Sequence, residues 1–108
     1  QSPHLARFSI SGQFCMLRVA GVFLRRPISI YSTGKGTVSF LYKIIGKGTE
    51  TLSAMKPGEK IEVLGPLGKG YPIEEERKEY TPVRIAGGTG IASLHFLIQN
   101  LRKTGILI

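Results

Sequence analysis

Four short apolar runs, each ended by a glycine or proline turn, constrain the fold of this chain more than any other feature. The runs are rich in β-branched and aromatic residues and cover Phe14–Val19, Ile28–Ser32, Thr37–Ile45 and Ile61–Leu64. Short runs of this composition at close spacing are typical of an antiparallel barrel or sandwich. A single short helix is predicted among them, over Thr49–Met55. We therefore expect residues 1–79 to form a mainly β domain.

The pattern changes near residue 80. A continuous apolar run, Val83–Ala86, is followed by a glycine turn, a helical pattern over Ala92–Lys103 and a second apolar run, Ile106–Ile108. Strand, glycine turn, helix and strand is how a parallel α/β domain begins. We therefore expect residues 80–108 to be the first βαβ unit of a truncated α/β domain.

The formal charge of +8 does not by itself assign the chain to nucleic acid. Its 15 lysines and arginines are scattered from Arg7 to Lys103, and no short window is dominated by them. A basic arm that binds nucleic acid would concentrate them. A general attraction for phosphorylated small ligands uses this charge at least as well.

Residues suited to acid–base or metal chemistry are few. The chain has no Asp, and most of its carboxylates gather in the segment Glu74–Glu79, which is typical of a solvated linker. His4 and His95 have no partner at metal-ligand or catalytic spacing. We therefore predict no catalytic acid or base and no metal site within these residues.

Cys15 is the only cysteine, so the chain can form neither an internal disulfide nor an all-cysteine metal site. This favours a reducing, cytoplasmic setting and an inert core thiol. The longest apolar stretch, Ile91–Leu101, is interrupted by polar residues and is too short to cross a bilayer, so no membrane association is expected. Because the chain stops inside the apolar run Ile106–Ile108, we expect it to be a fragment.

The segment Arg26-Pro27-Ile28-Ser29 puts a guanidinium, a rigid proline and a small hydroxyl at the start of a strand. In an extended strand Arg26 and Ile28 project to one face, and Pro27 and Ser29 project to the other. An ordinary edge strand with a solvated arginine would have the same sequence. The functional alternative is that Arg26 binds a pyrophosphate while Ser29 reaches the edge of a bound ring.

Two glycine turns are suited to phosphate binding. Gly46-Lys47-Gly48-Thr49 opens the first predicted helix, and Gly87-Gly88-Thr89-Gly90 precedes the second. Glycines let the backbone approach a ligand closely, and free N–H groups at a helix start favour phosphate. A plain N-cap at Thr49 and a plain strand-to-helix turn at Gly87–Gly90 stay open as alternatives, because the dinucleotide fingerprint is met only loosely.

The order and spacing of these segments resembles the ferredoxin–NADP reductase superfamily over the whole chain. The resemblance also includes Tyr42-Lys43, Pro57-Gly58-Glu59 and Gly65-Pro66-Leu67-Gly68-Lys69-Gly70. The strand Arg25–Ile30 is most similar to the branch that serves class 1B dihydroorotate dehydrogenases. Ile28 favours the same branch, since many other reductases carry a flavin-stacking tyrosine there. The resemblance implies an antiparallel Greek-key FAD-binding barrel, incomplete here, followed by an NAD-binding domain.

The resemblance also implies a set of cofactor-binding residues. These are Arg26, Pro27, Ile28, Ser29, Leu41, Tyr42, Lys43, Gly48, Thr49, Gly87, Gly88, Thr89 and Gly90. Arg26 would bind the FAD pyrophosphate and Ser29 would lie near the reactive edge of the ring. Gly48 and Thr49 would bind phosphates through backbone N–H groups. The segment Gly87–Gly90 would face NAD.

The implied function is FAD-dependent electron transfer between NAD and a catalytic dihydroorotate dehydrogenase subunit, in pyrimidine biosynthesis. A two-iron cluster is expected only in a cysteine-rich C-terminal segment outside these residues, and the first barrel strands are expected to precede Ser11–Phe14. Two alternatives stay open. One is a related reductase-like subunit of the sulfhydrogenase or glutamate-synthase type. The other is a basic β-barrel that binds single-stranded nucleic acid, which would need exposed aromatics among its cations.

Overall fold

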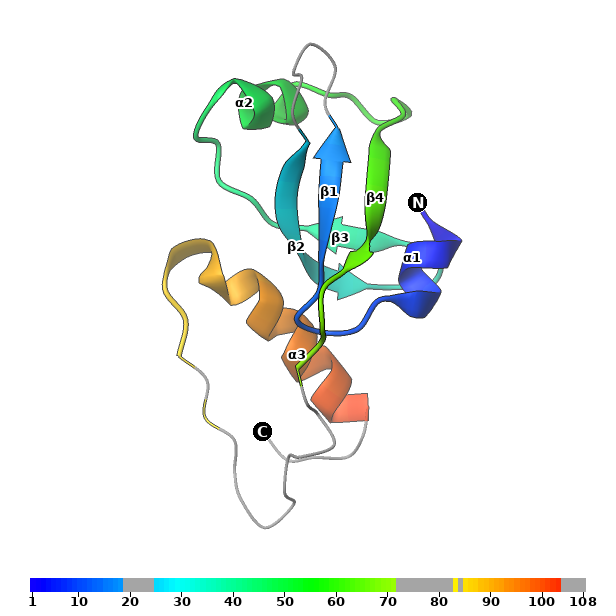
Figure 1. The fold of residues 1–108 in the computed structure, drawn as a ribbon, viewed down its shortest axis with the longest axis vertical. Coiled ribbons are helices and arrows are strands. Elements are labelled where there is room, and N and C mark those ends of the chain that lie inside the picture. Colours follow the sequence, from blue (N-terminus) through cyan, green and yellow to red (C-terminus); the bar gives the residue numbers. More distant parts are fainter. Residues whose placement is uncertain (19–24, 72–82, 84, 104–108) are drawn as a thin grey trace.

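The computed structural model describes residues 1–18, 25–71, 83 and 85–103 (Figure 1). Along these residues the elements are α1 (Pro3–Phe8), β1 (Phe14–Arg18), β2 (Arg26–Thr33), β3 (Val38–Phe40), α2 (Lys47–Ser53), β4 (Glu62–Leu67), the single 3₁₀ turn η2 (Gly88–Gly90) and α3 (Ile91–Lys103). No helix in this part of the chain is both long enough and apolar enough to span a membrane.

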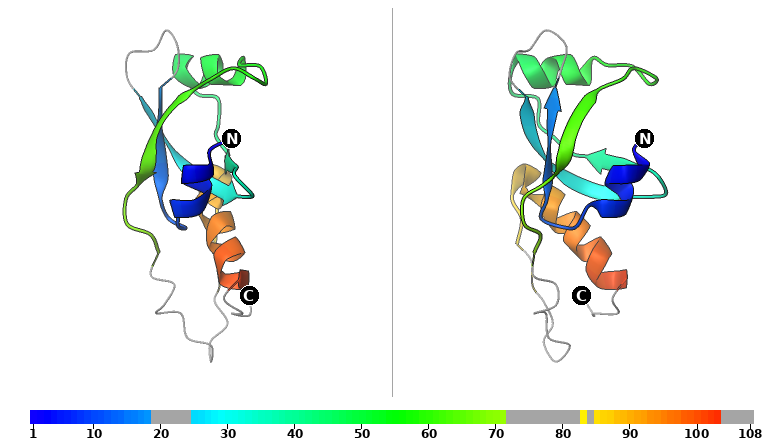
Figure 2. Two further views of the ribbon diagram at one scale, coloured as in Figure 1. Left: turned by 90° about the vertical axis from the view of Figure 1, so that its right-hand side faces the viewer. Right: turned by 45° about the vertical axis from the view of Figure 1, so that its right-hand side comes forward.

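The strands form one four-stranded antiparallel sheet in the order β3-β2-β1-β4. Strand β2 bends along its length: its first half, Arg26–Ser29, pairs with β1, and its second half, from Ile30 to Thr33, pairs with β3. The register shifts between Ile30 and Ser32, where the bend falls. Figure 2 shows the resulting twist of the sheet. The predicted mainly β, antiparallel fold is confirmed.

The core lies on one face of this sheet. Cys15 and Leu17 of β1 and Ile28 and Ile30 of β2 are buried, because alternate residues of a strand point to the same face. Leu5 from α1 and Phe96 from α3 pack onto the same cluster. Helix α3 thus completes a core that begins with Leu5, close to the first residue of the chain.

The helix Lys47–Ser53 and the strands β1 and β2 lie close to their predicted positions, whereas β3 is much shorter than predicted. The apolar run was expected to continue as a strand to Ile45, but β3 ends at Phe40. From Leu41 the chain leaves β2, and Ile44 and Ile45 are exposed. The physical reason lies at the far end of this segment, where Thr49 binds its backbone and directs it into α2.

Strand β4 continues through Gly65 and Pro66, which the sequence had suggested as a turn. Gly65 makes this possible, because a Cβ atom at that position would lie 2.7 Å from the sulfur of Cys15 on β1. Glycine at this position therefore lets β4 pair with β1 without displacing the Cys15 side chain. The turn follows instead at Gly68, which has a φ of 87°.

Two further predictions differ from the structure. Helix α1 was not predicted, although Ser2 and Pro3 form a helix-start signal: the Ser2 hydroxyl accepts from the Leu5 N–H at 3.3 Å. The predicted strand Val83–Ala86 is wrong in its described residues, since 83, 85 and 86 are outside any strand and Val83 and Ile85 are 83% and 90% exposed. A strand needs a neighbour for its backbone groups, and the described part of the chain supplies none there. The predicted strand Ile106–Ile108 and the acidic segment lie outside the described residues.

Candidate functional site

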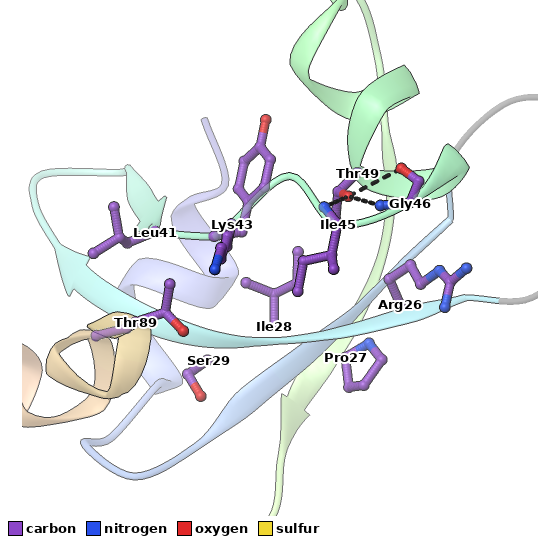
Figure 3. Close-up of a pocket in the computed structure, with 12 residues that line it drawn as sticks. Arg26, Pro27, Ile28, Ser29, Leu41, Lys43, Ile45, Gly46, Thr49 and Thr89 are labelled. Atoms are coloured by element: carbon purple, nitrogen blue, oxygen red, sulfur yellow. Dashed lines mark hydrogen bonds between the residues drawn. The ribbon is translucent and has the colours of Figure 1, made fainter. Parts of the chain in front are cut away.

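A pocket of about 510 Å³ opens beside the first half of strand β2 (Figure 3). It lies where the segment 41–46 has left the sheet, between β2, the start of α2 and the start of α3. Its lining residues are Arg26, Pro27, Ile28, Ser29, Leu41, Tyr42, Lys43, Ile45, Gly46, Thr49, Thr89 and Ala92. The pocket therefore joins three segments that are far apart in the sequence.

Most residues singled out from the sequence meet in this pocket. All the predicted residues of β2 and of the segment 41–43 line it, together with Thr49 and Thr89. Gly87, Gly88 and Gly90 are exposed in the turn before α3 and do not line it. Sequence reasoning missed Ile45, Gly46 and Ala92, although Gly46 belongs to a turn that it had marked.

Gly48 does not line the pocket but lies buried directly behind Arg26. A Cβ atom at Gly48 would lie 2.8 Å from Nε and 3.3 Å from Cγ of Arg26. Contacts under 3.0 Å force one of the groups to move. Glycine at this position therefore lets the Arg26 side chain lie against the start of α2, where Figure 3 shows it.

The two adjacent arginines have different surroundings. The guanidinium of Arg25 donates to Glu62 on β4, and Arg18 lies 3.7 Å from the same carboxylate. Arg26 has no ion pair among the described residues. Of this arginine pair, only Arg26 is available to a ligand.

The charged residues that line the pocket in the described part of the chain are both basic. These are Arg26 and Lys43, and no Asp or Glu is among the described lining residues. Both side chains are exposed at its mouth. A pocket of this size with two unopposed cations favours an anionic ligand such as a phosphate ester.

The Thr49 hydroxyl shapes the loop that forms one wall. It accepts from the N–H of Ile45 at 2.8 Å and of Gly46 at 3.2 Å, and it donates to the Gly46 carbonyl at 3.1 Å. These contacts are the dashed lines in Figure 3. The hydroxyl is thus occupied by the loop, and only the backbone N–H groups at the start of α2 are left for a ligand.

The backbone of β2 beside the pocket faces β1 only at alternate residues. Since the Ile30 N–H donates to the carbonyl of Gln13, directly before β1, the backbone of Ile28 also faces β1, and the backbone of Pro27 and Ser29 faces the opposite edge. Strand β3 pairs with that edge only as far as Phe40, opposite Ile30, so the pairing ends before Pro27. Figure 3 also shows the predicted alternation of side chains, with Ile28 toward the 41–46 segment and Ser29 away from it.

The other candidate groups are structural. Burial raises the pKa of the Cys15 thiol, which is fully enclosed by the core. His95 is half-buried and contacts the Tyr31 carbonyl, and His4 contacts the ring of Phe8. Among the described residues no group of His, Cys, Asp or Glu is arranged to hold a metal ion.

The fold of the chain is similar to that of a solved reductase. The structure is described as an NADH-dependent reduced ferredoxin–NADP oxidoreductase, studied for flavin-based electron bifurcation. The TM-score is 0.64 at 34% identity, over 68% of this chain and 29% of the other. The sheet with its pocket therefore defines a protein of the ferredoxin–NADP reductase class.

Comparison with curated sequences narrows this class. The chain is 41% identical over 105 residues to the dihydroorotate dehydrogenase B (NAD⁺) electron transfer subunit of Desulforamulus reducens, which is 93% of this chain and 39% of that protein. It is 42% identical over 102 residues to the same subunit of Bacillus cereus (strain Q1) and of Bacillus anthracis (strain CDC 684). No family model matches. The chain belongs to the family of these electron transfer subunits and spans about 39% of their length.

Proposed function

We propose that the chain is the flavin-binding part of an electron transfer subunit that exchanges electrons between NAD and a catalytic dihydroorotate dehydrogenase subunit. The observation that carries this proposal is the pocket beside β2, which has two cations and, among its described lining residues, no carboxylate. The names of the relatives support the redox role and the partner. In this proposal the subunit acts in pyrimidine biosynthesis in the cytoplasm.

The residues present fit FAD. Arg26 would bind the pyrophosphate, since Gly48 makes room for its side chain and no acidic group of the described residues neutralises it. The backbone N–H groups of Gly48 and Thr49, at the start of α2, would bind the same phosphates. When bound, FAD supplies both hydride and one-electron chemistry, so the task of the protein is to hold and orient it.

The ring of the cofactor would lie along the open edge of β2. Ser29, Leu41, Tyr42 and Lys43 line that part of the pocket. The Ser29 N–H faces this edge and would bond to the polar rim of a flavin, and Ser29 is an exposed residue with a hydroxyl that could do the same. Leu41 and Tyr42 provide apolar contact for the faces of the ring.

NAD would bind at the exposed turn Gly87–Gly90. A Cβ atom at Gly87, Gly88 or Gly90 would meet no atom of the described residues within 4 Å, so these residues leave room for a ligand beside the turn. Thr89 of the same turn lines the flavin pocket, which brings the two proposed sites together. In this proposal residues 1–79 form the barrel and residues 80–108 begin the NAD-binding domain. The two-iron cluster would be bound by a segment outside these residues.

A related reductase subunit with a different partner is the second candidate, because the similar solved structure is itself a ferredoxin–NADP oxidoreductase. Nucleic-acid binding is disfavoured. Of the aromatic residues in the described part of the chain, only Phe8 and Tyr71 are exposed, so no platform for stacking bases is formed.

The test is a titration of the full-length protein with FAD, followed by visible absorption and flavin fluorescence. We expect Arg26→Ala to weaken binding about tenfold or more, because a charge-assisted hydrogen bond to phosphate is lost. Arg7→Ala is the control, since Arg7 is an exposed arginine on α1 that does not line the pocket. A folded protein that binds neither FAD nor FMN would overturn the proposal.

A further inference from the structure

Helix α3 presents one continuous stripe of residues to strand β2. Ala92, His95, Phe96 and Gln99 follow the i, i+3, i+4, i+7 spacing of a single helix face. Phe96 is buried in the core with Ile28 and Ile30 of β2, and the helix packs along that strand. The stripe begins at the flavin pocket, which Ala92 lines, and ends about 10 Å further along the helix at Gln99.

At that end, Gln99 is bonded to the backbone of β2 through both atoms of its amide. Its Nε2 donates to the Thr33 carbonyl at 2.9 Å, and its Oε1 accepts from the Thr33 N–H at 3.3 Å. The side chain thus satisfies both backbone groups of one strand residue, as a neighbouring strand would. The contact therefore restrains the helix from sliding along the strand and from moving away from it.

His95 adds a second polar contact on the same face. Its ring packs on the ring of Tyr31 with 4.1 Å between centroids, and its Nδ1 lies 3.1 Å from the Tyr31 carbonyl. Because a carbonyl only accepts, Nδ1 carries the proton in this contact. Tyr31 and Thr33 therefore hold the helix at two alternate positions of the strand.

Both elements have their other end in the pocket. Strand β2 supplies Arg26 to Ser29, and the start of α3 supplies Ala92, directly after the turn that carries Thr89. Any slide of the helix along β2 changes the distance between these two walls. A contact that stops the slide consequently sets the width of the pocket.

We propose that Gln99 is a positioning residue for the flavin site: its bond to Thr33 sets the start of α3 at the distance from β2 that the cofactor requires. This inference rests on the proposed function. Gln99 is half-buried, so water could solvate its amide if the contact were broken, and the apolar packing of Phe96 is enough to keep the helix in the core. The Gln99 amide therefore sets the position of the helix along β2, while Phe96 keeps the helix packed in the core.

The experiment compares three variants of the full-length protein. Gln99→Met keeps the length and volume of the side chain and removes both hydrogen bonds. Gln99→Glu keeps the acceptor and removes the donor. Asn100→Ala is the control, since it changes the adjacent half-buried amide on another face of the helix. Two quantities are measured: the affinity for FAD, by flavin fluorescence, and the hydrogen exchange of the Thr33 amide.

We expect Gln99→Met to speed exchange at Thr33 and to weaken FAD binding about three- to tenfold. Gln99→Glu should be impaired at least as much, because it places a carboxylate oxygen beside the Thr33 carbonyl, which Nε2 now contacts at 2.9 Å. Asn100→Ala should change neither quantity. Since Gln99→Met preserves volume, a residue that only filled space would leave both unchanged.

Unchanged FAD affinity in Gln99→Met, with or without faster exchange at Thr33, would overturn the positioning role alone. Failure of the wild-type protein to bind FAD would instead overturn the proposed function, and the positioning role with it. The two failures are thus separated by the wild-type titration.

Discussion

At the scale of single residues, Arg26 and Gly48 act as one unit. A side chain at position 48 would collide with Arg26, because its Cβ atom would lie 2.8 Å from Nε of the arginine. Glycine avoids this contact. Arg25, one position earlier, is instead held by Glu62 on β4. Of these two adjacent arginines, Arg25 is thus paired with β4 and Arg26 lines the pocket.

Gly48→Ala should therefore separate affinity from stability. Alanine in a helix is favoured over glycine by about 0.5–1 kcal/mol, so the free energy of unfolding should stay the same or rise. FAD binding should weaken about fivefold, because the Arg26 side chain must move away and a charge-assisted contact is impaired. Thermal unfolding and FAD titration measure the two effects.

The control for this prediction is the double variant Arg26→Ala, Gly48→Ala. If glycine acts through Arg26, the second substitution should have little further effect once Arg26 is gone. If Gly48→Ala instead weakens FAD binding by the same factor with and without Arg26→Ala, Gly48 contributes to binding independently of the arginine.

At the scale of elements, the departure of segment 41–46 from strand β2 creates the pocket. Strand β3 pairs with β2 only as far as Phe40 opposite Ile30. Beyond it, the Thr49 hydroxyl binds the backbone of Ile45 and Gly46 and holds the segment at the start of α2. The wall of the pocket therefore depends on a hydroxyl group that is hydrogen-bonded to the backbone of the wall itself.

We expect Thr49→Val to loosen this wall. Valine keeps the shape of threonine but leaves two N–H groups without their acceptor, which should cost about 1 kcal/mol of stability and speed hydrogen exchange at Ile45 and Gly46. FAD affinity should fall as the segment moves. Thr49→Ser keeps the hydroxyl and should retain the slow exchange, and a serine variant as impaired as the valine variant would contradict this role.

At the scale of the whole molecule, the sheet and helix α3 share one core. Phe96 is 1% exposed and contacts the same cluster as Cys15 and Ile30, while α3 belongs to the part of the chain that the sequence assigned to the next domain. Burial of a large side chain at this junction joins the stability of the two parts.

Phe96→Ala should accordingly destabilise the sheet as well as the helix. A buried Phe truncated to Ala costs about 3–5 kcal/mol, and we expect a single unfolding transition at lower urea concentration. Phe8→Ala, which removes an aromatic ring that is 54% exposed on α1, should cost less than about 1 kcal/mol. An early transition that melts only the helix, leaving the midpoint of the sheet unchanged, would contradict the shared core.

The sequence predicted what local pattern determines. Strand β1 follows from its apolar run, β2 follows from its β-branched and aromatic residues, and α3 follows from its helical spacing. The central elements and most of the pocket residues could therefore be named in advance. The end of β3 could not be predicted, because it is set by Thr49 several residues downstream. The packing of Phe96 on β2 depends on contacts more than sixty residues apart, which periodicity does not encode.

Because Pro27 has no backbone N–H, it limits how far a neighbouring strand can pair with β2. Its backbone faces the edge of β2 where β3 no longer pairs, and proline has no N–H to offer there. If the segment after Phe40 were to extend β3 along β2, the hydrogen bond that a backbone N–H at position 27 would donate could not form. The longer strand would therefore gain little stability from the additional pairing. The missing donor at Pro27 thus disfavours extension of β3 across the pocket, and the pocket beside β2 stays open.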